Sequence, residues 1–295
     1  MPFLSKTPPP FTLTTGVNGL QKVVFSASDG ARAEIYLHGA HLTSWIPAGG
    51  EERLFLSQAA EFGPESAIRG GVPVIFPQFS DKGPLPKHGF ARRVNWDFLN
   101  AEKGRDNISA AFLLRETPAS LLLWPHSFIA GLLVTLGGRE IELNLTITHT
   151  DAAPFTFTAA LHTYIQVAEI RDVYLDGLCN RRFLDSTHEG EENVQEDKYL
   201  LFEDEVDRVY PDVTGILKVN ERNLHLQIQS EGFRDVVVWN PWMERGATLA
   251  DLEPKGYRRM LCVESAAIQR PVTLEPGDSW NGIQRLVDES PAGQS

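Results

Sequence analysis

The stretch at residues 139–149, REIELNLTITH, alternates apolar and polar side chains over its whole length. The apolar positions fall on every second residue and are Ile141, Leu143, Leu145 and Ile147. Because successive side chains of a strand point to opposite faces of a sheet, this period of two predicts a half-buried β-strand.

A second apolar run, SFIAGLLVTL at 127–136, comes before this strand, and Gly137-Gly138 lies between the two. Tight hairpin turns need residues with positive φ, which glycine adopts without strain. The two runs are therefore predicted to form a β-hairpin.

Similar strand-like runs recur along the chain. They lie at 21–27, 31–37, 94–99, 107–114, 155–163, 215–219, 223–229, 234–239, 259–264 and 280–287. Helical periodicity is almost absent, and only 57–62 and 242–252 favour a turn or two of helix. Many short strands separated by Gly, Pro, Asn and Asp predict an all-β fold, either a sandwich or a barrel.

The composition limits the possible classes of function. The chain has 295 residues, 42% of them hydrophobic, and a formal net charge of −12. This charge argues against a general binder of nucleic acid or of anionic membranes, since both require a basic surface. We find no targeting segment and no apolar run of transmembrane length, and we expect a cytoplasmic protein.

We expect one large domain. The predicted boundaries are an N-terminal arm at 1–20, a single β domain at 21–288 and a disordered tail at 289–295. The two cysteines, Cys179 and Cys262, form no CxxC pair, so zinc-ribbon and thioredoxin-like sites are excluded. Their low number suits a reducing compartment, and a single disulfide remains open.

The most unusual stretch is 68–93, IRGGVPVIFPQFSDKGPLPKHGFARR. It is rich in glycine and proline, and it concentrates basic side chains in an acidic protein; these are Arg69, Lys87, Arg92 and Arg93, with His88 beside them. Arginine pairs well with phosphate or carboxylate groups. The stretch is therefore a candidate anion-binding loop, although a surface loop that pairs with the surplus acids remains an alternative.

Two residues on predicted strands are candidates for acid–base chemistry. His162 lies in FTFTAALHTYIQV, and Glu264 lies in RMLCVESA. A glutamate in an apolar run must be paired or exposed on one face, and burial would raise its pKa and make it a better base. The residues alone leave open a core histidine bonded to backbone and a solvent-facing glutamate.

Other candidates are weaker. Asp207 in EDEVDRVY is suited to accept hydrogen bonds from sugar hydroxyls, and Trp239 in WNPW is suited to stack on a sugar. Each also fits an ordinary role, a solvated acid for the first and a core aromatic for the second. His38 and His41 are three residues apart, but no third metal ligand is evident, so we predict no metal site. No nucleotide-binding loop is present, and no cofactor is predicted.

Six motifs occur together in one order along the chain. They are IRGGVPVIFPQF at 68–79, HGFAR at 88–92, ALHTY at 160–164, VDRVY at 206–210, VVWNPW at 237–242 and MLCVESA at 260–266. In these motifs the chain resembles the hexose-6-phosphate mutarotases, also called glucose-6-phosphate 1-epimerases, of the aldose 1-epimerase superfamily. The resemblance spans about residues 25–287, nearly the whole chain.

This resemblance implies a large antiparallel β-sandwich of the galactose mutarotase-like type, with no cofactor. It also implies that the enzyme interconverts the anomers of a hexose 6-phosphate, with glucose 6-phosphate favoured. The implied catalytic residues are His162 and Glu264. The implied substrate contacts are Arg69, Lys87, Arg92 and Asp207, to which we add His88 and Trp239.

Three alternatives remain. The first is an aldose 1-epimerase that acts on unphosphorylated sugars, and the second is a non-catalytic protein that binds sugar phosphates. The third is a glycoside hydrolase, but that reaction usually needs two carboxylates, whereas the candidates here are a histidine and a glutamate. We expect a monomer whose partner is a small sugar phosphate, with no nucleic acid and no membrane.

Overall fold

A computed structural model of the protein describes residues 10–291. The predictions for 1–9 of the N-terminal arm and for 292–295 of the tail lie outside this range. The described chain forms three β-sheets, and every pairing between their strands is antiparallel. The expected all-β, antiparallel fold is therefore confirmed.

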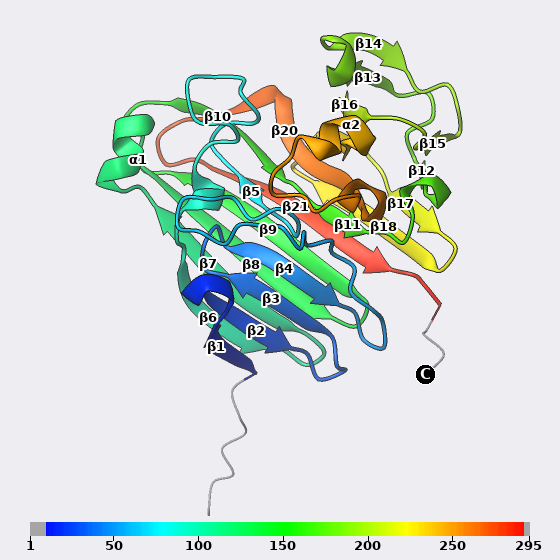
Figure 1. Ribbon diagram of the computed structural model, residues 1–295. Coiled ribbons are helices and arrows are strands. Elements are labelled where there is room, and N and C mark those ends of the chain that lie inside the picture. The colour runs from blue at the N-terminus through cyan, green and yellow to red at the C-terminus, as the bar shows by residue number, and fades with distance from the viewer. Residues whose placement is uncertain (1–9, 292–295) are drawn as a thin grey trace, which may run out of the picture.

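The first sheet comes from the N-terminal part of the described chain. In spatial order its strands are β1 (Phe11–Thr15), β2 (Gln21–Ser26), β3 (Arg32–Tyr36) and β4 (His41–Ile46). Figure 1 shows this sheet in blue at the lower end of the molecule. Strand β1 falls within the stretch that we expected to be an arm, and it pairs with β2 instead of standing apart.

The second sheet has nine strands. In spatial order they are β15 (Tyr199–Leu201), β12 (Tyr174–Asp176), β17 (Leu217–Glu221), β18 (Leu224–Glu231), β21 (Ser279–Asp288), β9 (Glu140–His149), β8 (Phe128–Gly137), β7 (Ile108–Arg115) and β6 (Asp97–Lys103). The predicted hairpin at Gly137-Gly138 is confirmed, because β8 and β9 pair along their length and Gly138 has φ of 60° in the turn.

The third sheet positions the candidate site. In spatial order its strands are β14 (Glu191–Val194), β13 (Arg182–Asp185), β16 (Val206–Tyr210), β19 (Asp235–Asn240), β20 (Met260–Leu274), β10 (Phe155–Leu161) and β5 (Val74–Ile75), and β11 (Tyr164–Gln166) also pairs with β20. Strand β19 is buried along nearly its whole length, as its apolar run predicted. The acidic stretch 185–198, which is not among the predicted strands, includes β14, and β14 pairs with β13.

Helices are few and short in the described residues. The α-helices are α1 (Pro118–Leu123) and α2 (Trp242–Ala247), and single 3₁₀ turns occur at Val17–Gly19, Ala91–Arg93, Ile170–Asp172, Ser186–His188 and Gly256–Arg259. The helix expected in 242–252 is present as α2, but the one expected at 57–62 is wrong. There a single hydrogen-bonded turn forms, in which the N–H of Ala60 donates to the carbonyl of Ser57, and it does not continue into a helix. The Ser57 hydroxyl lies 2.7 Å both from the carbonyl oxygen of Asp251 and from Oε2 of Glu253, which ties this segment to a distant loop.

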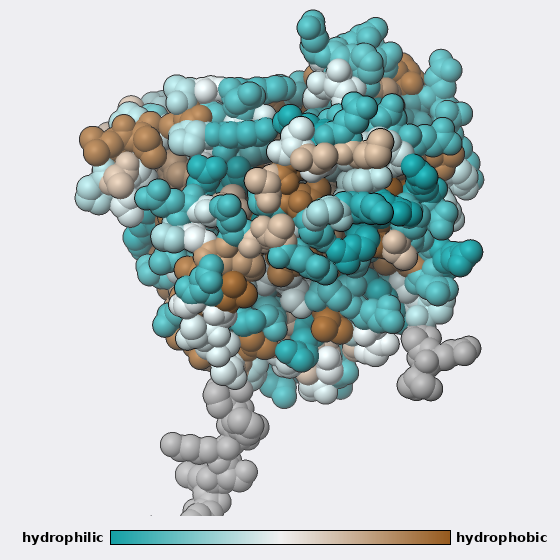
Figure 2. All heavy atoms as spheres, in the orientation of Figure 1, coloured by the Kyte–Doolittle hydropathy of each residue, from teal (hydrophilic) through white to brown (hydrophobic). Residues whose placement is uncertain are grey.

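The three sheets share one apolar core. A single buried cluster includes Val23 of the first sheet, Leu143 of the second and Val238 of the third. The face shown in Figure 2 is mainly hydrophilic, with a brown apolar group over α1 that comes from the exposed Leu121, Leu122 and Leu123. No helix among the described residues has the length and apolarity needed to cross a bilayer. The single domain at 21–288 stays a prediction.

Candidate active site

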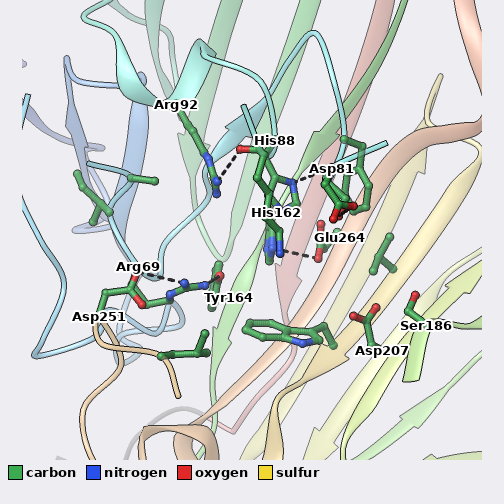
Figure 3. Close-up of a pocket in the computed structure, with 18 of the residues that line it drawn as sticks. Arg69, Asp81, His88, Arg92, His162, Tyr164, Ser186, Asp207, Asp251 and Glu264 are labelled. Atoms are coloured by element: carbon green, nitrogen blue, oxygen red, sulfur yellow. Dashed lines mark hydrogen bonds and ion pairs between the residues drawn. The ribbon is translucent and has the colours of Figure 1, made fainter. Parts of the chain in front are cut away.

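A cavity of about 570 Å³ opens over the third sheet. All eight residues singled out from the sequence line this cavity: Arg69, Lys87, His88, Arg92, His162, Asp207, Trp239 and Glu264. They come from segments that are far apart in the chain, and Figure 3 shows most of them converging on one space. The sequence motifs therefore describe one site.

The histidine and the glutamate meet at the centre of the site. His162 directly follows β10, and its N–H donates a hydrogen bond to the carbonyl of Pro73. Glu264 lies in β20, where it pairs with Val237 of β19. Nε2 of His162 lies 3.3 Å from Oε1 of Glu264, and the two side chains are only 8% and 2% exposed.

Burial shifts the pKa values of this pair in opposite directions. It raises the pKa of Glu264 well above the ordinary value, and Asp207 raises it further. Burial also lowers the pKa of His162 well below 6.5, with His88 and Arg92 acting in the same direction. Both shifts favour the uncharged form of the group concerned.

Aromatic rings hold the imidazole of His162. Nδ1 of His162 is buried without a hydrogen-bond partner in the described residues. Instead, the ring of Tyr164 stacks on the imidazole with centroids 4.8 Å apart and planes inclined by 6°. Trp239 and His88 meet it edge-on, at 6.1 and 5.7 Å. Packing, and not an Nδ1 hydrogen bond, therefore sets the orientation of this ring.

Tyr164 also contacts the first of two arginines in the site. Nη1 of Arg69 donates a hydrogen bond of 2.8 Å to the Tyr164 hydroxyl, and Nη2 lies 3.0 Å from Oδ2 of Asp251. The guanidinium also lies 5.9 Å from the centre of the Trp239 ring. Arg69 is thus held in place and already partly neutralised by a carboxylate.

Arg92 differs from Arg69 because it forms no ion pair with any carboxylate in residues 10–291. Its Nη2 donates to the backbone carbonyl of Lys87 at 3.1 Å. Burial lowers the pKa of Arg92 to about 10, which leaves the group charged at neutral pH. A half-buried cation without a counter-ion is poorly solvated, and it is therefore a strong receptor for an anion.

Two glycines bring the Arg69 segment close to the sheet. Gly70 and Gly71 have φ of 111° and 60°, and an added Cβ would lie 2.3 Å from the carbonyl oxygen of Phe55 and 2.2 Å from that of Leu42, respectively. Only glycine fits such contacts. The glycine pair in the basic stretch therefore fixes the place of Arg69 beside the site.

His88 is neutral and its tautomer is set by the backbone. Nδ1 of His88 accepts a hydrogen bond from the N–H of Ser80, so the ring proton lies on Nε2. Burial lowers the pKa of His88 to about 2, and Arg92 and Lys87 contribute to this shift. His88 is thus a neutral hydrogen-bond donor within a cluster of cations, whereas the side chain of Lys87 is exposed at the rim of the cavity.

Asp207 and Trp239 are neighbours on paired strands, β16 and β19. Burial raises the pKa of the Asp207 carboxyl, while Ser186 and Lys87 act in the opposite direction. Figure 3 shows Asp207 and Ser186 on the side of His162 and Glu264 that lies away from Arg69.

Among the cavity residues that were not sequence candidates, Tyr164, Asp251 and Ser186 contact or act on the candidates. Tyr164 lies in the ALHTY motif, two residues after His162, and the alternation of a strand would have placed both on one face. Asp251 and Ser186 gave no signal, because a single acid or hydroxyl in a polar loop has no distinguishing pattern.

Metal ligation is not indicated by the described residues, which contain no group of three or more His, Cys, Asp or Glu side chains suited to hold an ion. Nε2 of His38 contacts the carbonyl of Ser66, and Nε2 of His41 contacts that of Gly70, both at 2.7 Å. Each of these two histidines thus contacts a backbone carbonyl.

Known proteins resemble this chain over nearly all of its length. The family model described as aldose 1-epimerase matches residues 21–286. The chain belongs to the aldose 1-epimerase family. Within the aldose 1-epimerase family, it is 40% identical over 287 residues to a Cenchrus ciliaris protein named "Putative glucose-6-phosphate 1-epimerase", an alignment that covers 93% of this chain and 87% of the relative.

Solved structures agree with this membership. A Salmonella typhimurium protein described as a "putative mutarotase" superposes with a TM-score of 0.86 at 28% identity, over 95% of this chain and 97% of the other. A galactose mutarotase-like protein from Clostridium acetobutylicum gives a TM-score of 0.75 at 14% identity, over 95% and 98% of the two chains. The galactose mutarotase-like sandwich, the family and the class of enzyme, an epimerase, are thereby confirmed.

Proposed function

We propose that the protein interconverts the α and β anomers of a hexose 6-phosphate, with glucose 6-phosphate favoured, and that His162 and Glu264 carry the chemistry. One observation supports this proposal above all. The buried His162–Glu264 pair shares a cavity with Arg92, a cation that no carboxylate of the described residues neutralises. A hexose 6-phosphate suits both groups, because its ring can react at the His162–Glu264 pair while its phosphate dianion binds Arg92.

The reaction needs one base and one acid at two oxygens of the same carbon. Glu264 takes the proton of the O1 hydroxyl, the O1–H electrons form the C1=O1 double bond, and the C1–O5 bond breaks. His162 gives its proton to O5. The open aldehyde turns about C1–C2, and the ring closes on the other face of C1 with the proton roles reversed. A pair 3.3 Å apart reaches O1 and O5 together, since both are attached to C1.

The basic residues anchor the phosphate. Arg92 and Arg69 donate charge-assisted hydrogen bonds to it, with Lys87 and His88 as further donors. Once C6 is held in this way, C1 stays next to the catalytic pair while its aldehyde group turns about the C1–C2 bond. Trp239 packs against the sugar, and Asp207 accepts hydrogen bonds from ring hydroxyls.

The phosphate also prepares the acid. Before a substrate binds, burial and the nearby positive charge disfavour the protonated form of His162. A bound dianion cancels much of that positive charge and raises the pKa of His162. The shared proton then moves from Glu264 to His162, which gives the carboxylate and imidazolium that ring opening requires.

We take the enzyme to act as a monomer in the cytoplasm. The two cysteines of the chain are free, which suits a reducing compartment. Sedimentation of the purified protein tests the first statement, and a monomer mass is expected.

Anomer exchange measured by NMR tests the proposed function. The exchange rate between the two anomeric protons is followed for glucose 6-phosphate, glucose and galactose, with the uncatalysed rate subtracted. We expect the largest kcat/KM for glucose 6-phosphate. Equal values for glucose and glucose 6-phosphate would instead identify an aldose 1-epimerase of unphosphorylated sugars. Tight binding of glucose 6-phosphate without faster exchange would identify a binding protein.

A further inference from the structure

The cavity over the third sheet has an acidic end and a basic end. Glu264 lies on β20, and Asp207 lies on β16, with β19 between the two strands. At about 4.8 Å per strand spacing, the backbone of Asp207 is roughly 10 Å from that of Glu264. On the other side of β20, Tyr164 of β11 bonds through its N–H to the carbonyl of Gly71, which places the Arg69 segment at the opposite end.

The catalytic pair is aligned with this division. After burial, Asp207 has the largest effect on the pKa of Glu264 and raises it, with Arg92 acting next and in the opposite direction. The cations Arg92 and Arg69 both lower the pKa of His162. Figure 3 shows the same order in space, with the arginines on one side of the pair and Asp207 on the other. His162 thus faces the cationic end, and Glu264 faces the acidic end.

A hexopyranose 6-phosphate also has two distinct ends on either side of C1 and O5. Its ring oxygen is bonded to C5, which carries C6 and the phosphate, whereas O1 is bonded to C1, next to C2. If His162 serves the ring oxygen and Glu264 serves O1, as in the proposed function on which this inference rests, the phosphate lies at the cationic end. The substituent on C2 then faces Asp207.

The cations that act on the acidic end, Arg245, Lys82 and Lys87, are exposed side chains in the wall of the cavity. Asp207 and Glu205 both line the cavity there, and neither forms an ion pair within residues 10–291. Lys82 and Lys87 act on Asp207 from exposed positions at the rim, where water screens their charge. A half-buried carboxylate in this position favours a ligand that brings its own positive charge.

We propose that the cavity also accepts 2-amino-2-deoxyhexose 6-phosphates, whose ammonium group at C2 pairs with Asp207. An amine differs from a hydroxyl by little in volume, so a cavity that admits glucose 6-phosphate admits glucosamine 6-phosphate. The bond changes of ring opening are the same, and the ammonium keeps its proton throughout. Asp207 is therefore a specificity-determining residue at the end opposite the phosphate.

Anomer-exchange NMR at pH 6.5 on glucosamine 6-phosphate and glucose 6-phosphate tests the proposal, because the amine is charged there. For the wild-type protein we expect KM for the amino sugar to be about fivefold lower, as an ion pair at a half-buried site predicts. In Asp207→Asn the ratio of the two KM values should approach one. Asp204→Asn removes the same charge outside the cavity and should keep the wild-type ratio.

The possible outcomes distinguish a failure of this proposal from a failure of the proposed function on which it rests. If neither sugar phosphate exchanges faster with enzyme, the proposed function falls. If glucose 6-phosphate is turned over but the amino sugar has an equal or higher KM, only the present proposal is overturned. A ratio that stays unchanged in Asp207→Asn also overturns it. N-acetylglucosamine 6-phosphate, which lacks the charge, should show no advantage over glucose 6-phosphate.

Discussion

Nε2 of His162 lies 3.3 Å from Oε1 of Glu264, although His162 follows β10 and Glu264 lies in β20, and both side chains are almost completely buried. Burial favours the uncharged form of each group, so the pair holds one shared proton. Acid–base ring opening needs the same number of protons, but it needs the proton on His162 and not on Glu264.

Glu264→Gln should lower kcat for glucose 6-phosphate by about 10²–10⁴, because the amide does not accept the O1 proton. The variant should also be more stable. The raised pKa of Glu264 means that above about pH 4.5 the folded protein binds more protons than the unfolded chain, so this residue costs stability as pH rises.

Thermal unfolding checks the second part. We expect Tm of Glu264→Gln to rise by roughly 2–4 °C at neutral pH, which corresponds to about 1 kcal/mol, and the gain to shrink toward pH 4.5. A variant that keeps near wild-type turnover would remove Glu264 from the mechanism.

The acid limb of the pH profile should lie well below pH 6.5. Activity is lost on the acid side when the pair takes up a second proton, and burial lowers the pKa of His162 that governs this step. The measurement of kcat/KM uses glucose, which has no group that titrates in this range. An acid limb centred at pH 6.5, the ordinary value for histidine, would contradict the buried pair.

Arg92→Ala should raise KM for glucose 6-phosphate by about 10–100-fold, as the loss of a charge-assisted hydrogen bond predicts. Arg69→Ala should act in the same direction, but it also leaves Asp251 unpaired in the cavity wall. Both variants should change KM for glucose much less. Arg105→Ala, at an almost fully exposed side chain, is the charge-matched control. Equal losses on both sugars would argue against a phosphate site.

Inorganic phosphate should accelerate the mutarotation of glucose by this enzyme. A dianion at Arg92 offsets the positive charge that lowers the pKa of His162, and it thereby favours the protonated acid. We expect a saturable increase of several fold in kcat/KM, measured by polarimetry with the phosphate-catalysed background subtracted. Sodium chloride at equal ionic strength should have no such effect, and a response that persists in Arg92→Ala would locate the phosphate elsewhere.

Tyr164 connects the two halves of the site, and two substitutions separate its contributions. Tyr164→Phe removes the hydroxyl that accepts from Arg69 but keeps the ring stacked on His162, so KM for glucose 6-phosphate should rise several fold with little change in kcat. Tyr164→Ala also removes the stacked ring, and kcat should fall as well. If Phe and Ala lower kcat equally, the ring does not position the imidazole.

Much of the fold follows from local patterns. The alternation at 139–149 and the glycine pair before it predict β8 and β9 because both depend on neighbours in the sequence. The error at 57–62 has the opposite origin, since Ser57 is bound by residues almost two hundred positions away. The exposed β14 was missed because an acidic strand at a sheet edge carries no apolar alternation.

The candidate site also depends on contacts between distant residues that local sequence patterns do not predict. His162 and Glu264 were found through their motifs, and the structure adds that they meet, which no local pattern states. The ion pair between Arg69 and Asp251 joins two loops that approach each other only in the folded chain. The unpaired state of Arg92 also becomes visible only when all surrounding carboxylates are placed.

The acid and the base come from the third sheet, whereas Arg92 and His88 come from the connection between β5 and β6. Mutations can therefore alter the catalytic pair and the anion-binding residues separately. Mutations confined to residues 87–92 would change which anion is accepted while leaving the catalytic pair in place, so randomised libraries of that connection are a route to variants that accept other sugar derivatives.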